Sequence, residues 1–383
     1  MNKWQQVKLG DVSESCLGKM LDQRKNKGEL QPYLANIDVR WGEFDLDHLG
    51  AMKFESHEQE RYGLRYGDLV ICEGGEPGRC AIWKDQISNM KIQKALHRVR
   101  TDLKVLDNRF LFYWFLLAGK TGELEQYFTG ATIKHMPGQK LKEVKIPLPP
   151  IEVQRKIADI LSAYDDLIEN NRKQIKLLEE AAQRLYKEWF IDLRFPGHET
   201  TPIIDGIPKG WERKKLEKIC PILTGKRDAN FGSPEGKYLF FTCAQEPIKS
   251  ATFSFDTSAV ILAGNGDFNV KLYRGKFEAY QRTYVLSPQN SEMLFLLFGS
   301  VRTNMCDLTQ KASGSTIKFL TKGMIANIEI LVPDDNLLKQ YNNFSNNIQK
   351  KIEYLSDSIK YVTETRNRLL PKLMSGELEV KNG

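Results

Sequence analysis

Two long stretches of the chain have apolar positions that recur in alternating steps of four and three residues. The first stretch, residues 151–190, contains no Gly or Pro, so its forty residues predict a helix about 60 Å long. A stripe this narrow faces a partner only when two helices supercoil, so the pattern predicts a coiled coil. The seam positions are Ile157, Leu161, Tyr164, Ile168, Asn171, Ile175, Leu178, Ala182, Leu185 and Trp189.

The second stretch follows at an offset of 184 residues with the same spacing. The alternative, a helical hairpin inside one core, fits poorly with the length of the helices and with the 143 residues between them (191–333). Asn171, a lone polar residue in the first seam, is predicted to fix the register at some cost in stability. The matching positions are Tyr341, Ser345, Ile348, Ile352, Leu355, Ile359, Val362, Arg366, Leu369 and Leu373.

The repeat also covers the residues that precede each long helix. Each half opens on a Trp, contains a short apolar strand that enters a glycine turn, and contains an apolar helix followed by G-x-T-I-K. A duplicated unit of this kind predicts a pseudo-two-fold arrangement in which the two long helices are antiparallel. The matching segments are 4–19 with 211–226, 67–78 with 258–269, 110–117 with 294–301, and 130–134 with 314–318.

These segments predict an α+β protein with two pseudo-two-fold related globular regions separated by an antiparallel coiled coil of two long helices. Proline before each helix suits a helix start, because the missing N–H has no partner there. Pro371 is expected to break or kink the last turn of the second helix. The predicted parts are globular region 1 (1–148), long helix 1 (149–191), linker and globular region 2 (192–332), long helix 2 (333–376) and a tail (377–383).

Composition and charge narrow the class of protein. The chain is 41% hydrophobic and 27% charged, and no apolar run is long enough to span a bilayer. The six cysteines show no C-x-x-C spacing and the N-terminus has no apolar leader, so we expect a cytoplasmic protein. The net charge of +7 lies in the globular regions, because residues 151–190 contain seven basic and eight acidic residues. A polyanion would therefore bind the globular regions.

The sequence gives little support for catalysis. Residues 260–269 (VILAGNGDFN) place G-x-G after an apolar strand, but the next residues alternate like a strand, whereas a cofactor loop leads into a helix. Pro149-Pro150 lacks the flanking residues of an amino-methyltransferase motif, and no phosphate-binding Lys follows a glycine run. No His, Cys or Asp cluster has metal-ligand spacing. We therefore expect a non-catalytic chain with no metal and no cofactor of its own.

Three segments resemble the specificity subunit of type I restriction-modification enzymes, a phage-defence family. They are 147–171 (PLPPIEVQRKIADILSAYDDLIENN), 188–197 (EWFIDLRFPG) and 207–212 (IPKGWE), and the resemblance extends over the whole repeat. It implies that each globular region is a target recognition domain for one half of a split, asymmetric double-stranded DNA target. It also implies that two methyltransferase subunits dock on the helices, that the helices set the half-site spacing, and that restriction subunits join the complex.

S-adenosylmethionine, ATP and Mg would then bind the partner subunits. The start of the second helix, 336–351, departs from the family pattern. The alternative is a DNA-binding or scaffold protein that works alone, or the recognition subunit of a related combined restriction-methylation enzyme.

Basic and polar side chains on loops are the candidates for DNA contact, since Arg and Lys pair with guanine and phosphate. Any one of them can instead be an ordinary solvated residue, and the repeated G-A-T and G-S-T segments can be turns that cap a helix. The candidates are Arg24, Lys25, Lys27, Arg79, Lys134 and His135 in the first half, and Lys226, Arg227, Lys271, Arg274, Ser315, Thr316 and Lys318 in the second.

Overall fold

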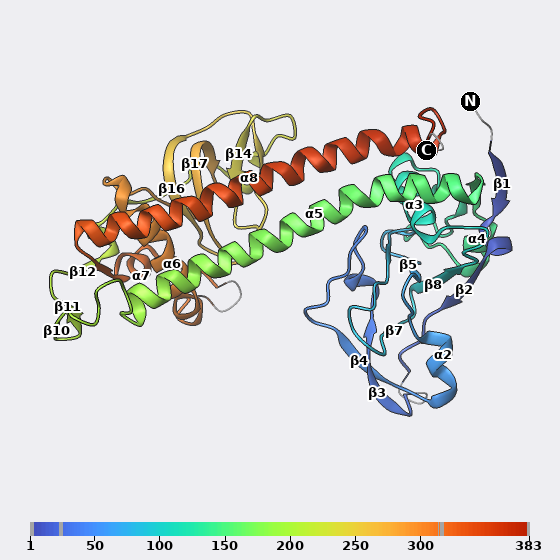
Figure 1. Ribbon diagram of the computed structural model, residues 1–383, viewed down its shortest axis with the longest axis horizontal. Coiled ribbons are helices and arrows are strands. Elements are labelled where there is room, and N and C mark those ends of the chain that lie inside the picture. The colour runs from blue at the N-terminus through green and yellow to red at the C-terminus, as the bar shows by residue number, and fades with distance from the viewer. Residues whose placement is uncertain (1–3, 23–25, 313, 315–317, 381–383) are drawn as a thin grey trace. The chain divides into compact units, whose positions relative to one another are not determined.

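The computed structural model describes residues 4–22, 26–312, 314 and 318–380. Its contacts divide the chain into two compact units: unit 1 is Met1–Asn170 with Ser358–Gly383, and unit 2 is Asn171–Asp357. Both divisions fall inside the long helices α5 (Ile151–Tyr186) and α8 (Asp335–Met374), because each half of a long helix packs against a different globular region (Figure 1).

The described residues of unit 1 form three small sheets. The central one has the order β2-β8-β5-β6, and all four residues of its strand β5 are buried. The strand β1 pairs with β9, and β3 lies between β4 and β7. The strands are β1 (Gln5–Lys8), β2 (Ser13–Leu17), β3 (Glu29–Leu34), β4 (Gly50–Phe54), β5 (Leu69–Cys72), β6 (Cys80–Ile82), β7 (Lys91–Ile92), β8 (Leu96–Thr101) and β9 (Lys145–Leu148).

The buried helix α3 (Asn108–Thr121) forms the centre of the unit 1 core. Asp107 caps its start by accepting the backbone N–H groups of Arg109 and Phe110, and Gly122, in the left-handed region at φ 75°, ends it. Eight of its residues are buried, which explains why its sequence is apolar all round. The described part of the unit also contains the short α-helices α1 (Leu9–Val12), α2 (Gln59–Tyr62) and α4 (Gly138–Glu143), and 3-10 helices at Asn36–Asp38, Ser56–Glu58 and Glu125–Tyr127.

Unit 2 repeats this plan with a larger sheet of order β13-β18-β16-β17-β14-β15. The strand β12 pairs with β19 as β1 pairs with β9, and the buried helix α6 (Leu294–Gln310) matches α3. Its strands and its short α-helix are β10 (Ile203–Ile204), β11 (Ile207–Pro208), β12 (Glu212–Lys215), β13 (Ile222–Thr224), β14 (Tyr238–Phe241), β15 (Ile248–Ser250), β16 (Phe255–Ala263), β17 (Val270–Ala279), β18 (Thr283–Leu286), α7 (Lys322–Ala326) and β19 (Glu329–Val332). A π-helical turn at Lys187–Ile191 and 3-10 helices at Leu216–Lys218, Ala229–Phe231 and Ser291–Met293 also occur.

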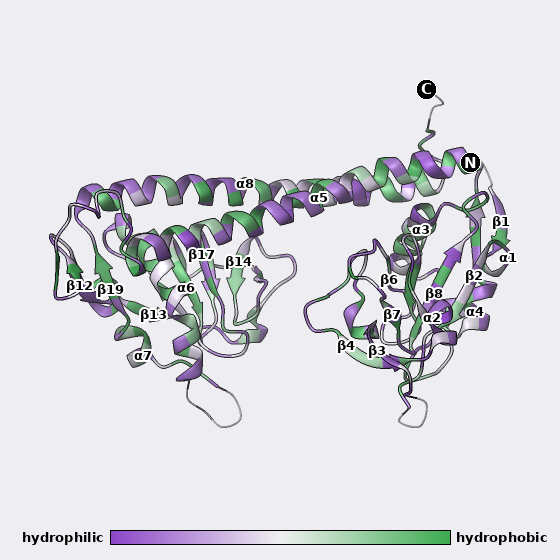
Figure 2. Ribbon diagram, turned by 60° about the horizontal axis from the view of Figure 1, so that its bottom comes forward, coloured by the Kyte–Doolittle hydropathy of each residue, from purple (hydrophilic) through white to green (hydrophobic). Residues whose placement is uncertain are grey.

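Within each unit the two long helices pack side by side in opposite directions. In unit 1, Ile157 near the start of α5 belongs to the same buried cluster as Leu373 near the end of α8. In unit 2, Tyr186 at the end of α5 lies 6.5 Å from Tyr341 near the start of α8, ring centre to ring centre. Every predicted seam position is buried or half-buried. Figure 2, coloured by hydropathy, shows apolar residues in green alternating with polar residues in purple along both long helices.

One expectation about the helix ends needs correction. Pro371 does not break α8, which continues to Met374, because the proline removes only its own N–H while its carbonyl still accepts the Ser375 N–H at 3.0 Å. Within the predicted linker, Phe195 packs on Trp211 with ring centres 4.7 Å apart. The mixture of helices and strands confirms the α+β class. Among the described residues, none of the helices is both long and apolar enough to cross a membrane.

Candidate nucleic-acid interface

A glycine turn and a loop meet at one edge of the central sheet of unit 1. The turn, residues 73–78, follows β5, and the loop, residues 129–135, follows the 3-10 helix Glu125–Tyr127 that comes after α3. The Met136 N–H donates to the Glu73 carbonyl at 2.7 Å, and Gly74 forms a β-bridge with His135. A Cβ atom at Gly74 would lie 2.9 Å from the His135 ring, so glycine permits this close approach.

Unit 2 repeats this geometry with different side chains. The Leu320 N–H donates to the Gly264 carbonyl at 2.8 Å, and Asn265 forms a β-bridge with Phe319. Under the repeat, Phe319 corresponds to His135. The same backbone arrangement therefore presents two chemically different surfaces, one in each unit.

Several predicted contact residues lie exposed on these surfaces or on neighbouring loops. His135 forms the bridge in unit 1 and Lys134 precedes it, and Lys318 occupies the place in unit 2 that matches Lys134. Lys27 and Lys226 are also exposed. Four other predicted residues, Arg24, Lys25, Ser315 and Thr316, lie outside the described residues.

Two predicted contact residues also have partners within the fold. The Arg79 guanidinium donates to the Asn36 carbonyl at 3.0 Å and pairs with Glu76 at 3.2 Å. Arg227 pairs at 3.4 Å with Glu278, which is fully buried, and its guanidinium lies 4.3 Å from the Phe231 ring centre. Both cations therefore stabilise the fold, and their contact with DNA stays a prediction.

Lys271 and Arg274 of β17 also have internal partners. The Lys271 ammonium donates to the Ala244 carbonyl at 3.0 Å, and burial lowers its pKa. Arg274 donates two hydrogen bonds of 3.2 Å to Asn346 of α8 and lies over the Phe295 ring. Arg274 therefore contacts α8, whereas Lys271 contacts the loop that follows β14, and their contact with DNA stays a prediction.

The sheet register explains the role of Arg274. Leu69 pairs with Ile82 in unit 1 as Val260 pairs with Leu272 in unit 2, so Lys84 corresponds to Arg274. Lys84 also reaches a long helix, where it pairs with Glu169 of α5 at 3.1 Å. The sheet register reveals this shared role, whereas the sequence offset of 191 between β5 and β16 would pair Lys84 with Gly275.

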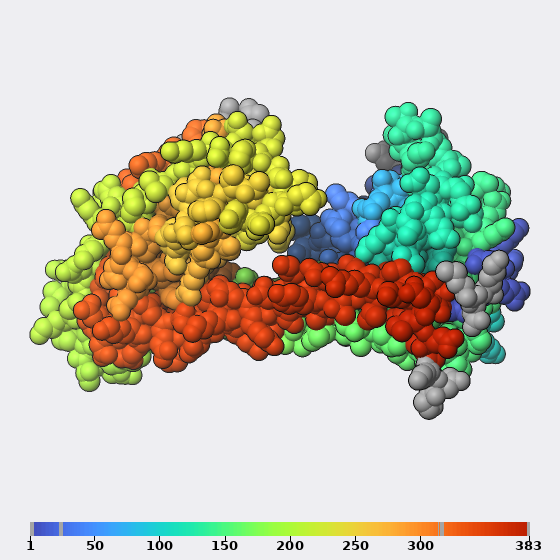
Figure 3. Space-filling model, turned by 90° about the horizontal axis from the view of Figure 1, so that it is seen from above, coloured from blue at the N-terminus to red at the C-terminus, as the bar shows by residue number. Residues whose placement is uncertain are grey.

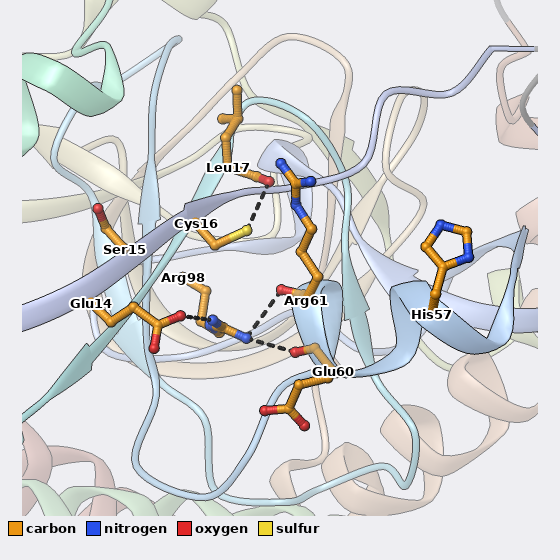
Figure 4. Close-up of a pocket in the computed structure, with 8 residues that line it drawn as sticks. All are labelled: Glu14, Ser15, Cys16, Leu17, His57, Glu60, Arg61 and Arg98. Atoms are coloured by element: carbon orange, nitrogen blue, oxygen red, sulfur yellow. Dashed lines mark hydrogen bonds and ion pairs between the residues drawn. The ribbon is translucent and has the colours of Figure 1, made fainter.

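A polar pocket of about 480 Å³ lies beside β2 in unit 1. Figure 4 shows Arg98 at its base, where the buried guanidinium pairs with Glu14 at 2.9 Å and donates to the Glu60 and Arg61 carbonyls at 3.0 Å. The Cys16 thiol is directed to the Leu17 carbonyl at 3.3 Å, and His57 lies apart from it in the same view. The thiol and imidazole thus do not form a nucleophile–base pair.

One group of possible metal ligands exists among the described residues, although the sequence predicted none. Glu55, His57 and Glu58 place ligand atoms within 4.8 Å of one another. The Glu58 carboxylate already pairs with the buried ammonium of Lys19 at 2.5 Å and accepts the Glu55 N–H at 3.0 Å. A cation would have to displace Lys19, so this group fits a structural role.

Comparison with known proteins agrees with the repeat. Residues 1–180 and 208–370 match the family described as type I restriction modification DNA specificity domain. The specificity subunit of the type I restriction enzyme MjaIX from Methanocaldococcus jannaschii is 29% identical over 307 residues, 72% of this chain and 70% of that protein. The EcoDI specificity subunit from Escherichia coli is 37% identical over 183 residues, 45% of this chain and 39% of that protein.

A solved structure shares the fold. The crystal structure of a type I restriction-modification S subunit from M. genitalium superposes with a TM-score of 0.60 at 16% identity, and covers 97% of this chain and 96% of that chain. The family match extends over both halves of the repeat. The chain therefore belongs to the type I restriction-modification DNA specificity family.

Proposed function

We propose that the two units read the two halves of a split, asymmetric DNA target, one half-site for each unit. The observation that supports this most is the repeated junction of glycine turn and loop, which has unlike side chains at matching places, His135 in one unit and Phe319 in the other. Similar scaffolds with different side chains suit two different base sequences. Lys134 and Lys318, exposed beside the two junctions, would contact phosphate.

The long helices would dock two methyltransferase subunits and fix the distance between the half-sites, and restriction subunits would complete the complex. A rigid helical spacer makes half-site separation a geometric property, as dimer geometry does in other DNA readers. S-adenosylmethionine, ATP and Mg would bind those partner subunits, and this chain would contribute only the recognition of the DNA sequence.

DNA binding by the assembled complex at several salt concentrations tests the recognition role. Removal of one lysine–phosphate interaction should reduce the slope of log K against log [salt] by about one. We expect this change for Lys134→Ala and for Lys318→Ala, and no change for the control Lys176→Ala on the exposed face of α5. Slopes equal to that of the wild type in both loop variants would reject the two phosphate interactions.

Co-purification separates this proposal from its alternative. A specificity subunit should be recovered with a methyltransferase when both are expressed in the host. A scaffold or DNA-binding protein that acts alone should be recovered without one and should bind its target with unchanged affinity in the absence of partners.

A further inference from the structure

A polar cluster fills the space between α3 and the two long helices in unit 1. Asp165 of α5 accepts the Tyr113 hydroxyl at 2.6 Å and pairs with Arg366 of α8. Asn367 accepts from Arg366 at 3.0 Å and from Lys120 at 3.2 Å. The Arg366 side chain is only 17% exposed. In this unit, therefore, the chain supplies its own guanidinium between the globular region and the helices.

The matching positions in unit 2 cannot form this cluster. At the offset of 184 residues, Tyr113 corresponds to Leu297, Asp165 to Gln349 and Arg366 to Ala182. Hydroxyl, carboxylate and guanidinium are thus replaced by an isobutyl group, an amide and a methyl group. Ala182 and Gln349 line a groove of about 1080 Å³ between α5, α8, α6 and the face of β17. Figure 3 shows the hollow between the orange-red first half of α8 and the yellow-gold atoms of the sheet region.

The groove has an apolar wall, an acidic rim on α8 and three basic side chains that each have a partner within the chain. These are Lys271, bonded to the Ala244 carbonyl, Arg274, bonded to Asn346, and Arg302, paired with Glu179 at 3.8 Å. Phe241, Phe268 and Phe298 belong to its apolar wall, while Glu353 and Asp357, one helical turn apart on α8, belong to its rim. Gln349, which matches Asp165 of unit 1, donates its amide to the Glu353 carboxylate at 3.0 Å. In unit 2 the carboxylate therefore lies one helical turn further along α8 than the position that matches Asp165. A volume of 1080 Å³ holds several side chains.

We propose that this groove receives an arginine-bearing apolar segment of the methyltransferase subunit that docks on unit 2. The acidic rim and aromatic wall complement a guanidinium on an apolar segment. Unit 1 independently shows that a guanidinium fits at the matching place, since Arg366 occupies it. The inference rests on the proposed docking of two methyltransferase subunits. It adds that the two copies are held differently, because only unit 2 leaves this place open to a partner.

The test occupies the groove with a larger side chain introduced by substitution in this chain. Ala182→Arg places a guanidinium where Arg366 stands in unit 1, and Ala181→Arg, on the neighbouring exposed residue of α5, is the matched control. Each variant is co-expressed with the methyltransferase, and the stoichiometry is measured by native mass spectrometry. We expect two methyltransferases on the wild type and on Ala181→Arg. For Ala182→Arg we expect mainly one, with the second bound at least tenfold more weakly.

A second pair of variants removes charge without adding bulk. Glu353→Gln with Asp357→Asn should also weaken the second methyltransferase about tenfold, whereas Glu364→Gln, an exposed site elsewhere on α8, should not. If the charge variant and Ala182→Arg each bind two methyltransferases as tightly as the wild type does, this inference is wrong, but the proposed docking of two methyltransferases still stands. A wild-type chain that binds no methyltransferase would overturn the proposed docking and this inference with it.

Discussion

Arg366 of α8 pairs with Asp165 of α5 inside unit 1, although 201 positions separate them in the chain. Both side chains are largely withdrawn from water, with exposed fractions of 17% and 29%. The same carboxylate accepts the buried Tyr113 hydroxyl, and burial together with the Asp165 charge raises the pKa of that hydroxyl. One acidic residue thus ties both long helices to the helix at the centre of the unit 1 core.

Loss of this pair should lower stability measurably. Arg366→Ala leaves a partly buried carboxylate without its cation, so we expect the free energy of unfolding to fall by about 1–2 kcal/mol. Urea unfolding followed by circular dichroism measures it. Arg368→Ala, at an exposed site two residues later, should change it by less than about 0.5 kcal/mol. Equal losses in the two variants would contradict the role given to Arg366.

Two glycines at matching positions of the repeat should tolerate no side chain. A Cβ atom at Gly18 would lie 2.3 Å from the Gln93 carbonyl oxygen, and one at Gly225 would lie 1.9 Å from the Ala279 carbonyl oxygen. We expect Gly18→Ala and Gly225→Ala each to lower the free energy of unfolding by about 1–3 kcal/mol. The control Gly323→Ala, in α7 with no atom within 4 Å, should be neutral or stabilising by up to about 1 kcal/mol. Thermal unfolding of the three variants compares them.

The buried His97 should make unit 1 sensitive to acid. Its ring nitrogen Nε2 lies 3.1 Å from the Met136 carbonyl, and burial lowers its pKa despite the nearby Glu73 charge. Below about pH 6.5 the unfolded chain binds a proton that the folded chain does not, so this group lowers stability as pH falls and has no effect above that pH.

The contribution of His97 can be isolated by substitution. Between pH 7.5 and 5.5, His97→Gln should lose less stability than the wild type. Urea unfolding at the two pH values measures both losses. An undiminished loss in His97→Gln would assign the acid sensitivity to other groups.

The sequence was sufficient to predict the long helices, their opposite directions within each unit, and the apolar strands that enter the glycine turns. These features depend on periodic burial, and periodicity is visible in the chain itself. The strands β5 and β16 coincide with the apolar segments predicted to enter a glycine turn. The helices α3 and α6 coincide with the long apolar segments predicted to be buried helices.

The sequence was a poor guide to which cations are free. Arg227 and Lys226 are adjacent in the same loop, yet only Arg227 meets the buried Glu278, a residue 51 positions away. Long-range partners of this kind leave no local signal. At Ala182 the sequence is more informative, because the repeat offset of 184 pairs this alanine with Arg366 and so shows that unit 2 lacks the arginine at this position. The groove at that position is visible only in the structure.

The claim that two unlike units each read one half of a target is tested most directly by mapping methylated bases across the host genome, with and without this gene. The account predicts that deletion removes methylation from one motif, made of two different half-sites separated by a fixed number of unspecified bases. Gene-dependent methylation of a continuous or palindromic motif would contradict it.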